Sequence, residues 1–284
     1  MSDKEAKHAK HQTSEASPIV SKEEKKLVKE RVAIGANIVY EAIRREGEDE
    51  LARPASALAW SALAAGLSMG FSFVAEALLE ARLPDEPWRP LIAKFGYSVG
   101  FLIVVLGRQQ LYTENTLTVI LPLLLQKNLA TFLRVLRLWG IVLLYNAAGT
   151  LLFAYFVASV RFFNPQIRET FYSIGLAHTG ASFGISFVRA IFAGWLIALM
   201  VWLLPAAESS RLSVVIVLTY LIGLGGFNHI IAGSTTVFYL VALHKLSWAG
   251  YFREFFFPTL LGNIVGGVSL VAALGHAQVV AGKD

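Results

Sequence analysis

Long apolar segments occupy most of the chain, and they constrain its fold more than any other feature. A helix needs about 20 mostly apolar residues to cross the hydrocarbon core of a bilayer. Charged residues make up only 16% of the chain and cluster outside the apolar runs, whereas a soluble domain has about a quarter. The sequence therefore predicts an all-α membrane protein with six transmembrane helices, near residues 55–79, 91–125, 132–157, 183–206, 212–243 and 255–274.

The polar segments outside these runs define the predicted domain boundaries. Residues 1–20 are polar and poor in aromatic side chains, which predicts disorder. Residues 21–50 place apolar side chains at helical spacing among Lys, Glu and Arg. This pattern predicts an amphipathic cytoplasmic helix that lies on the membrane surface or on the protein itself. We expect the transmembrane domain to cover residues 51–276 and a C-terminal tail to cover residues 277–284.

An even number of crossings places both termini on the same side of the membrane. Basic residues close to a crossing favour the cytoplasmic side, and Arg44, Arg45 and Arg53 lie just before the first apolar segment. The later loops carry basic residues on both sides, so the predicted orientation depends on the N-terminus. We expect a multi-pass protein of a bacterial inner membrane with both termini in the cytoplasm.

The second apolar segment is too long for one crossing and has a polar centre, GRQQLYTENT, at residues 107–116. Unsatisfied helix ends and charges cannot face lipid, so this break must face protein or a water-filled cavity. Ionisable groups within a membrane are functional candidates by default. The alternative is an Arg108–Glu114 ion pair that only ties the loop to its neighbours. Thr113 lies at the turn itself, where its hydroxyl could donate to a passing anion.

The fifth apolar segment is interrupted by GLGGFNHIIAGS at residues 223–234, where glycines let the backbone leave the helix at low cost. His229 is the only histidine deep within an apolar segment. A lone buried histidine is usually a core residue with its hydrogen bonds satisfied. A histidine in a break can instead pass a proton to a weak-acid anion. We therefore place His229 and its neighbour Asn228 on a candidate solute pathway.

The two halves of the chain share short patterns in the same order. The third segment contains LLYNAAGTLL and the sixth contains LLGNIVGGVSL, which align Asn146 and Gly149 with Asn263 and Gly266. The first and fourth segments each carry an Ala-Gly pair, and the second and fifth are the broken ones. Three crossings per half imply an inverted 3+3 repeat with a solute site at the midplane, formed by helices 2 and 5 broken at mid-membrane. The alternative is that small residues merely pack helices closely.

The chain lacks the residues that several functional classes need. The chain has no cysteine, and its histidines show no metal-ligand spacing, so we expect no metal and no cofactor. No nucleophile–base set, carboxylate pair or phosphate-binding loop is present, which argues against an enzyme. The net charge of +5 comes largely from the Lys-rich N-terminus and does not indicate nucleic-acid binding.

The breaks LYTENT and GFNHIIAGS and the GNIVGG of the sixth segment resemble the formate/nitrite transporter family, most closely its YfdC-like branch. The resemblance implies an aquaporin-like homopentamer in the lipid bilayer, with one pore per protomer for formate, nitrite or a similar small monovalent anion. It implies His229 as the central histidine, Thr113 as the loop threonine and Asn263 as the asparagine of the sixth span. It also implies hydrophobic pore constrictions, at Phe101, Tyr112, Leu111, Ile222 and Tyr97.

Two features depart from the family pattern. The family usually has a vestibule lysine just before the fourth span, but the matching stretch here is AHTGASFGIS, without lysine. Arg189 could replace that charge, although it lies further along the helix. The first break also carries Arg108, where many relatives have a small residue.

Three hypotheses for function follow. In the first, an anion meets Thr113, Asn263 and His229, and the histidine orients or protonates it in a channel-like or proton-coupled passage. In the second, the pore passes water or another small neutral solute, and Arg108 acts as a cation-excluding filter. In the third, the protein is a non-conducting membrane scaffold with a vestigial pore.

Overall fold

The computed structural model describes residues 35–272 together with residues 275 and 277. Every regular element within these residues is helical. The predicted disordered segment 1–20, the first part of the predicted amphipathic helix and residues 278–284 lie outside the described residues.

Helix α3 (Ala36–Ala52) occupies the second half of the predicted amphipathic segment. Most of its large apolar side chains face the rest of the protein, and Ile43 is fully buried, whereas Ile38 is exposed. A Cβ on Gly47 would lie 2.1 Å from the carbonyl oxygen of Thr118, so only glycine permits this approach. Helix α3 therefore packs against the helical bundle through one face, as an amphipathic helix does. The domain boundaries expected from the sequence stay predictions.

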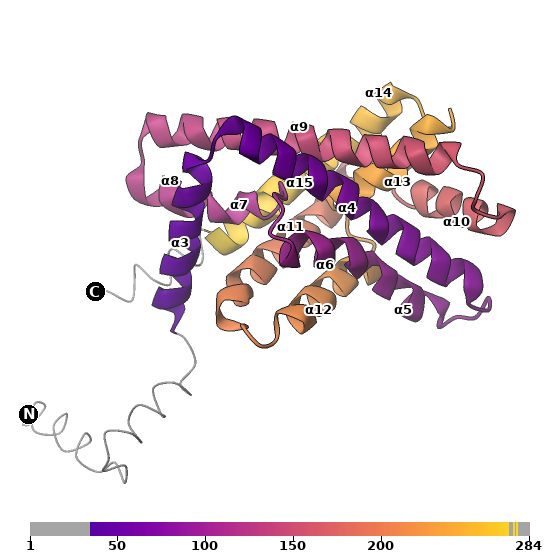
Figure 1. Ribbon diagram of the computed structural model, residues 1–284, viewed down its shortest axis with the longest axis horizontal. Helices are drawn as coiled ribbons and strands as arrows, with labels where there is room; N and C mark the ends of the chain where they lie inside the picture. Colours follow the sequence, from indigo (N-terminus) through magenta and orange to yellow (C-terminus); the bar gives the residue numbers. More distant parts are fainter. Residues whose placement is uncertain (1–34, 273–274, 276, 278–284) are drawn as a thin grey trace, which may run out of the picture. The chain divides into compact units, whose positions relative to one another are not determined.

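Three helices run without a break over predicted crossings: α4 (Ala55–Arg82), α9 (Leu129–Ser159) and α11 (Phe183–Leu203), which a short 3₁₀ turn, η2 (Leu204–Ala206), extends. Each is long and apolar enough to cross a membrane. Helix α9 begins where the side chain of Asn128 accepts a hydrogen bond from the backbone N–H of Thr131, 2.8 Å away. Helices α4 and α9 pack against each other, and in Figure 1 α4 begins beside α9 and slants away from it toward α5.

Two predicted crossings are broken, as the sequence indicated. The first consists of α5 (Arg89–Ala93), the 3₁₀ turn η1 (Lys94–Tyr97), α6 (Ser98–Leu106), a loop over residues 107–114, α7 (Asn115–Thr118) and α8 (Ile120–Gln126). The second consists of α12 (Arg211–Leu224), a loop over residues 225–229 and α13 (Ile230–Ala242). The left-handed backbone of Gly226, with φ of +60°, helps the chain leave α12.

The last apolar segment is an irregular helical run. It comprises α14 (Trp248–Gly250), the π-helical turn η3 (Tyr251–Phe256), α15 (Phe257–Val265) and the π-helical turn η4 (Gly266–Ala272). Helix α10 (Pro165–Leu176) was not predicted, because its residues do not form part of a long apolar run. The sequence at its start is nevertheless typical of a helix N-terminus. The Oδ1 atom of Asn164 accepts a hydrogen bond of 2.9 Å from the N–H of Ile167, and Pro165 occupies the first helical position.

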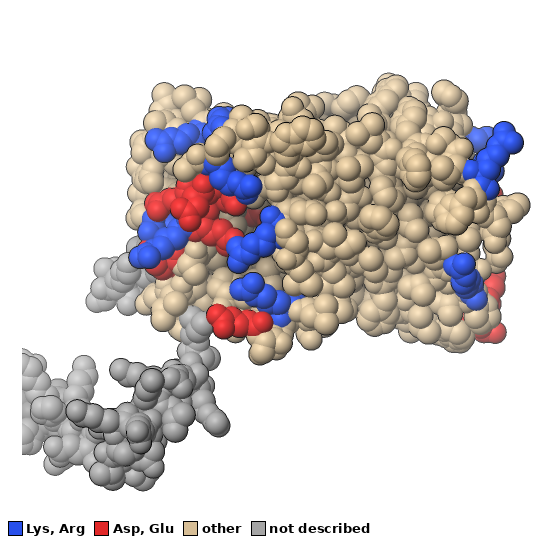
Figure 2. All heavy atoms as spheres, viewed as in Figure 1, with Lys and Arg blue, Asp and Glu red and all other residues tan. Residues whose placement is uncertain are grey.

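The surface has the distribution of charge expected of a membrane protein. On the face shown in Figure 2, charged side chains gather toward two opposite ends, and a broad band between them has none. Large apolar side chains are exposed along that length, including Leu144, Leu152 and Phe156 on α9 and Val217 on α12. A soluble protein rarely exposes so much apolar surface. The helices therefore present their apolar sides outward, to lipid or to partner subunits.

Close helix crossings depend on paired glycines. A Cβ on Gly66 of α4 would lie 2.3 Å from the carbonyl oxygen of Asn146 on α9. In the second half, a Cβ on Gly194 of α11 would lie 2.4 Å from the carbonyl oxygen of Asn263. Such contacts are too short for any side chain, so the two crossings need small residues.

Substitution of Gly66 by alanine should therefore lower the stability of the protein. We expect a loss of about 1–3 kcal/mol, because overpacking forces the two backbones apart. Gly140→Ala is the matched control, since a Cβ on Gly140 of α9 would meet nothing within 4 Å. Thermal unfolding in one detergent compares the variants. Equal midpoints for Gly66→Ala and Gly140→Ala would contradict the close crossing.

Candidate functional site

The two breaks meet at Thr113 and His229. Thr113 Oγ1 lies 2.7 Å from His229 Nε2, and neither residue is exposed. Thr113 lies at the end of the first break just before α7, and His229 ends the loop of the second just before α13. The structure thus brings together the threonine and the histidine that were expected on a solute pathway.

Backbone hydrogen bonding fixes the tautomer of His229. Its Nδ1 accepts a hydrogen bond of 3.1 Å from the backbone N–H of Ala232, so the side chain caps the start of α13. A nitrogen that accepts carries no proton, so the proton of neutral imidazole lies on Nε2. Nε2 then donates to Thr113 Oγ1. The hydroxyl proton of Thr113 stays available for a solute.

Asn263 braces the second break from α15. Its Nδ2 donates to the carbonyl oxygens of Ala190 (2.8 Å) and Asn228 (2.9 Å), and its Oδ1 accepts from the N–H of Ile230 (2.8 Å). Two of these bonds hold the residues on either side of His229, and the third ties Asn263 to α11. Asn263 was expected to contact the solute, but its hydrogen bonds all go to backbone groups.

Asn146 braces the first break in the same way from α9. Its Nδ2 donates to the carbonyl oxygens of Ala62 (2.7 Å) and Gln110 (2.9 Å), and its Oδ1 accepts from the N–H of Tyr112 (2.9 Å). Each asparagine thus joins one unbroken helix to both sides of a loop. The shared Asn-x-x-Gly patterns indicated this equivalence. A Cβ on Gly149 would lie 2.9 Å from the Cα of Gly66, and a Cβ on Gly266 would lie 2.8 Å from the backbone nitrogen of Trp195.

Apolar side chains surround the Thr113–His229 contact. The ring of Phe101 meets the ring of His229 edge-on, with centroids 5.0 Å apart, and Tyr97 packs on Phe101 at 5.3 Å. Tyr112 instead packs edge-on against Trp139 of α9, at 5.9 Å. The five residues expected at pore constrictions are all buried: Phe101, Tyr112, Leu111, Ile222 and Tyr97. The Tyr97 hydroxyl has no hydrogen-bond partner among the described residues.

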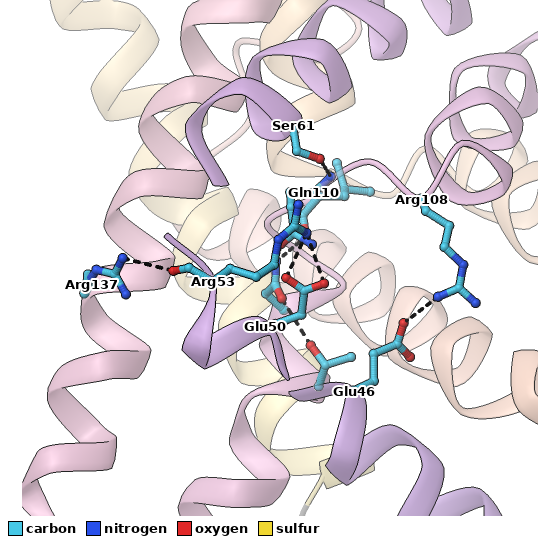
Figure 3. A network of polar contacts seen from close by, with 10 residues as sticks. Glu46, Glu50, Arg53, Ser61, Arg108, Gln110 and Arg137 are labelled. Carbon is cyan, nitrogen blue, oxygen red and sulfur yellow. Dashed lines mark hydrogen bonds and ion pairs between the residues drawn. The ribbon is translucent and has the colours of Figure 1, made fainter. Parts of the chain in front are cut away.

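Charged side chains from α3 meet the first break at one end of the protein, as Figure 3 shows. Arg108 donates to Glu46 at 3.2 Å, and its side chain is 71% exposed. Arg53 pairs with Glu50 at 3.1 Å, and Arg137 donates to the carbonyl oxygen of Arg53 at 3.1 Å. Burial raises the pKa of Glu50 above its ordinary value, although Arg53 opposes the shift. Arg108 therefore pairs with α3, and the Arg108–Glu114 ion pair that was considered as an alternative does not form.

A cavity of about 300 Å³ lies beneath α3. Glu46, Glu50 and Arg108 line it together with Glu114 and Arg211. Glu114 Oε1 and Arg211 Nε are buried there without a hydrogen-bond partner among the described residues. We call this cavity the α3 vestibule. It is lined by ionisable groups of both signs, one of which, Glu114, directly follows Thr113 in the chain.

A second polar group lies toward the other end, where α5 and α10 are found (Figure 1). Lys94 pairs with the buried carboxylate of Glu76. His178, in the turn after α10, has its Nδ1 3.2 Å from Oδ1 of Asn228. These contacts were not predicted, because they join residues far apart in the chain. No group of three potential metal ligands occurs among the described residues.

Comparison with known proteins identifies the family. The model of the formate/nitrite transporter family matches residues 37–277. The chain belongs to the formate/nitrite transporter family. It is therefore a multi-pass membrane protein of a transporter family and not an enzyme.

Individual members show the same relationship. The chain is 42% identical over 250 residues to "Inner membrane protein YfdC" of Escherichia coli (strain K12), covering 88% of this chain and 81% of the relative. It is 22% identical over 240 residues to "Formate channel BtFdhC" of Bacillus thuringiensis, covering 82% and 91%. The first of these confirms the likeness to the YfdC-like branch.

Solved structures confirm the fold. "Pentameric formate channel with formate bound" superposes with a TM-score of 0.68 at 20% identity, covering 80% of this chain and 98% of that one. "FNT family ion channel" superposes with a TM-score of 0.71 at 19% identity, covering 86% and 97%. The chain thus has the all-α fold of formate/nitrite transporter family channels.

Proposed function

We propose that the protein passes small monovalent weak-acid anions, of the formate or nitrite kind, through one pore in each protomer. The contact between Thr113 and His229 carries the proposal. It places one free hydroxyl proton at the meeting point of two helix breaks, between apolar side chains. Family membership, and relatives whose names contain formate or nitrite, support the choice of solute.

The chemistry follows from the hydrogen-bond directions. An anion that reaches Thr113 receives the hydroxyl proton as a hydrogen bond, while Nε2–H of His229 donates to the same oxygen and strengthens that donor. The start of α13, directly after His229, adds partial positive charge. Hydrogen bonds to charged groups are worth about 1.5–3 kcal/mol, which offsets part of the cost of leaving water.

The same geometry favours orientation of the solute by His229 over protonation. To donate a proton to the anion and end as neutral imidazole, His229 must first take up a second proton and become imidazolium. Its Nδ1 would then carry a proton and could no longer accept from Ala232 N–H. That change removes the cap of α13 in a buried site. We therefore propose that His229 stays neutral and does not supply the protons that accompany the solute.

The wider architecture is part of the proposal. We propose six crossings as an inverted 3+3 repeat, with helices 2 and 5 broken at mid-membrane, in an aquaporin-like homopentamer. The matched bonds of Asn146 and Asn263 support the repeat, and the two broken segments run in opposite directions in Figure 1. The pentameric relative supports the assembly, and the inner-membrane relative supports a bacterial inner membrane. Both termini would lie in the cytoplasm.

Reconstitution into proteoliposomes tests this function. We expect uptake of formate and nitrite above that of empty liposomes, and we expect His229→Asn to lower it by about 10- to 100-fold. Asparagine is a good helix N-cap, so this variant keeps the start of α13 while losing Nε2–H. A pH-sensitive dye inside the liposomes reports whether protons move with the anion.

The same liposomes separate the other two hypotheses. Fast water permeability by stopped-flow, without anion uptake, would indicate a channel for a neutral solute. Absence of any flux would indicate a non-conducting scaffold. The exposed position of Arg108, paired with Glu46 in the α3 vestibule, gives no support to a filter at this residue.

A further inference from the structure

His178 is linked to the pathway through one side chain. Its Nδ1 lies 3.2 Å from Oδ1 of Asn228, and its ring meets Phe255 edge-on with centroids 6.1 Å apart. Asn228 is only 2% exposed and directly precedes His229. Asn263 holds the carbonyl oxygen of Asn228 from 2.9 Å. The backbone of Asn228 is therefore fixed, and His178 determines how its amide side chain is turned.

The hydrogen bond orients the amide group of Asn228. An amide oxygen only accepts, so the proton of the bond lies on Nδ1 of His178. The Nδ2 group of Asn228 has no hydrogen-bond partner among the described residues, so both of its protons are free. Asn228 thus offers an N–H donor one residue from the Thr113–His229 contact. An anion is the natural partner for such donors in a buried site.

The surroundings of His178 control its charge. Burial lowers the pKa of His178 below its ordinary value, and the positive charges of Lys94 and Arg189 lower it further, while the bond to Asn228 opposes them. Lys94 is itself paired with Glu76, so its charge is partly neutralised. The carboxylate of Glu254 on η3 accepts a hydrogen bond of 3.3 Å from the N–H of Gly180, which lies in the same turn as His178. On the other side, His229 directly follows Asn228 in the chain. His178 is therefore neutral at pH 7 and gains positive charge as the pH falls.

We propose that His178 is a positioning and selectivity residue of the pathway, which holds the Asn228 amide with its N–H groups toward the anion and adds positive charge only on acidification. This inference rests on the proposed passage of anions. In this proposal, acidification raises the anion flux through the charge of His178, at the end of the pathway that lies opposite α3. A permanent cation at position 178 would attract anions at any pH, whereas histidine limits the attraction to acidic conditions.

Two variants separate orientation from charge. His178→Gln keeps an N–H donor for Asn228 but never becomes charged, and His178→Lys carries a permanent charge. Formate uptake into proteoliposomes is measured for all three proteins between about pH 7 and about pH 4, because the pKa of His178 is lowered to about 4. Dividing the wild-type flux by the His178→Gln flux at each pH cancels the effect of pH on the protonation of formate itself. We expect this ratio to rise several-fold as the pH falls, and we expect His178→Lys to exceed the wild type at pH 7.

The outcomes distinguish the inference from the proposed function. Formate flux in the wild type with the same pH profile in both variants would overturn the role of His178 and leave the proposed function intact. No formate or nitrite flux in the wild type would overturn both. Size-exclusion chromatography checks assembly. If His178→Gln fails to assemble, His178→Lys decides alone, because a profile parallel to that of the wild type contradicts charge control.

Discussion

Replacement of Thr113 by valine is expected to lower formate flux by about 10- to 100-fold. Valine has nearly the shape of threonine but lacks the hydroxyl that joins His229 to the solute. The anion then loses a hydrogen bond worth about 1.5–3 kcal/mol, and each 1.4 kcal/mol corresponds to a factor of ten. The N–H at Nε2 of His229 also loses its acceptor, which costs about 1–3 kcal/mol of stability. Proteoliposome uptake and thermal unfolding measure the two effects.

Two further variants serve as controls for this result. Thr113→Ser keeps the hydroxyl and should retain most of the flux. Thr150→Val makes the same chemical change at a buried threonine of α9 that bonds only to the carbonyl oxygen of Ala147, at 2.9 Å. We expect Thr150→Val to leave the flux unchanged. Equal loss in Thr113→Val and Thr150→Val would mean that the hydroxyl of Thr113 has no special part in conduction.

Hydropathy was sufficient to locate the long apolar helices, although not α10, because lipid imposes a length and a composition on every crossing. It also located the breaks, since Arg108, Glu114 and His229 have no place in an unbroken apolar helix. These features follow from local sequence alone. The break at residues 107–114 and the break at residues 225–229 lie within the predicted segments.

Partnerships across the fold were not accessible in the same way. The sequence suggested Arg108 and Glu114 as partners because they are close in the chain, whereas Arg108 reaches Glu46 on α3. The contact of His178 with Asn228 also joins separate elements, and no periodicity reports it. Hydropathy indicates which segments are apolar, but the choice of hydrogen-bond partner depends on how helices pack.

The two asparagines show what the sequence could indicate and what it could not. Asn146 and Asn263 were matched from the sequence, but only Asn263 was assigned to the solute pathway. In the structure each asparagine makes three hydrogen bonds to backbone groups, in the same pattern. Substitution of either one should therefore have a similar effect on the stability of the protein. This equivalence leads to a prediction about stability.

Replacement of either asparagine by alanine is expected to destabilise the protein by about 3 kcal/mol or more. Each change leaves one backbone N–H and one carbonyl oxygen of a break without a partner in a buried site, and each such group costs about 1–3 kcal/mol. Asn128→Ala is the control, because Asn128 makes a single capping bond at the exposed start of α9 and its loss should cost about 1 kcal/mol. Unfolding midpoints in one detergent give the ranking. A cost for Asn263→Ala no larger than that for Asn128→Ala would contradict the bracing role.

Aspartate at position 263 makes the sharpest test, because it has almost the same shape as asparagine. The carboxylate cannot donate, so its oxygens would face the carbonyl oxygens of Ala190 and Asn228 in place of the present N–H groups. Burial of a charge against two acceptors costs more than an empty space does. We therefore expect Asn263→Asp to be less stable than Asn263→Ala and to lose formate flux with it. If Asn263→Asp proves as stable as the wild type, the hydrogen bonds of Nδ2 do not hold the break, and the loop around His229 must depend on packing alone.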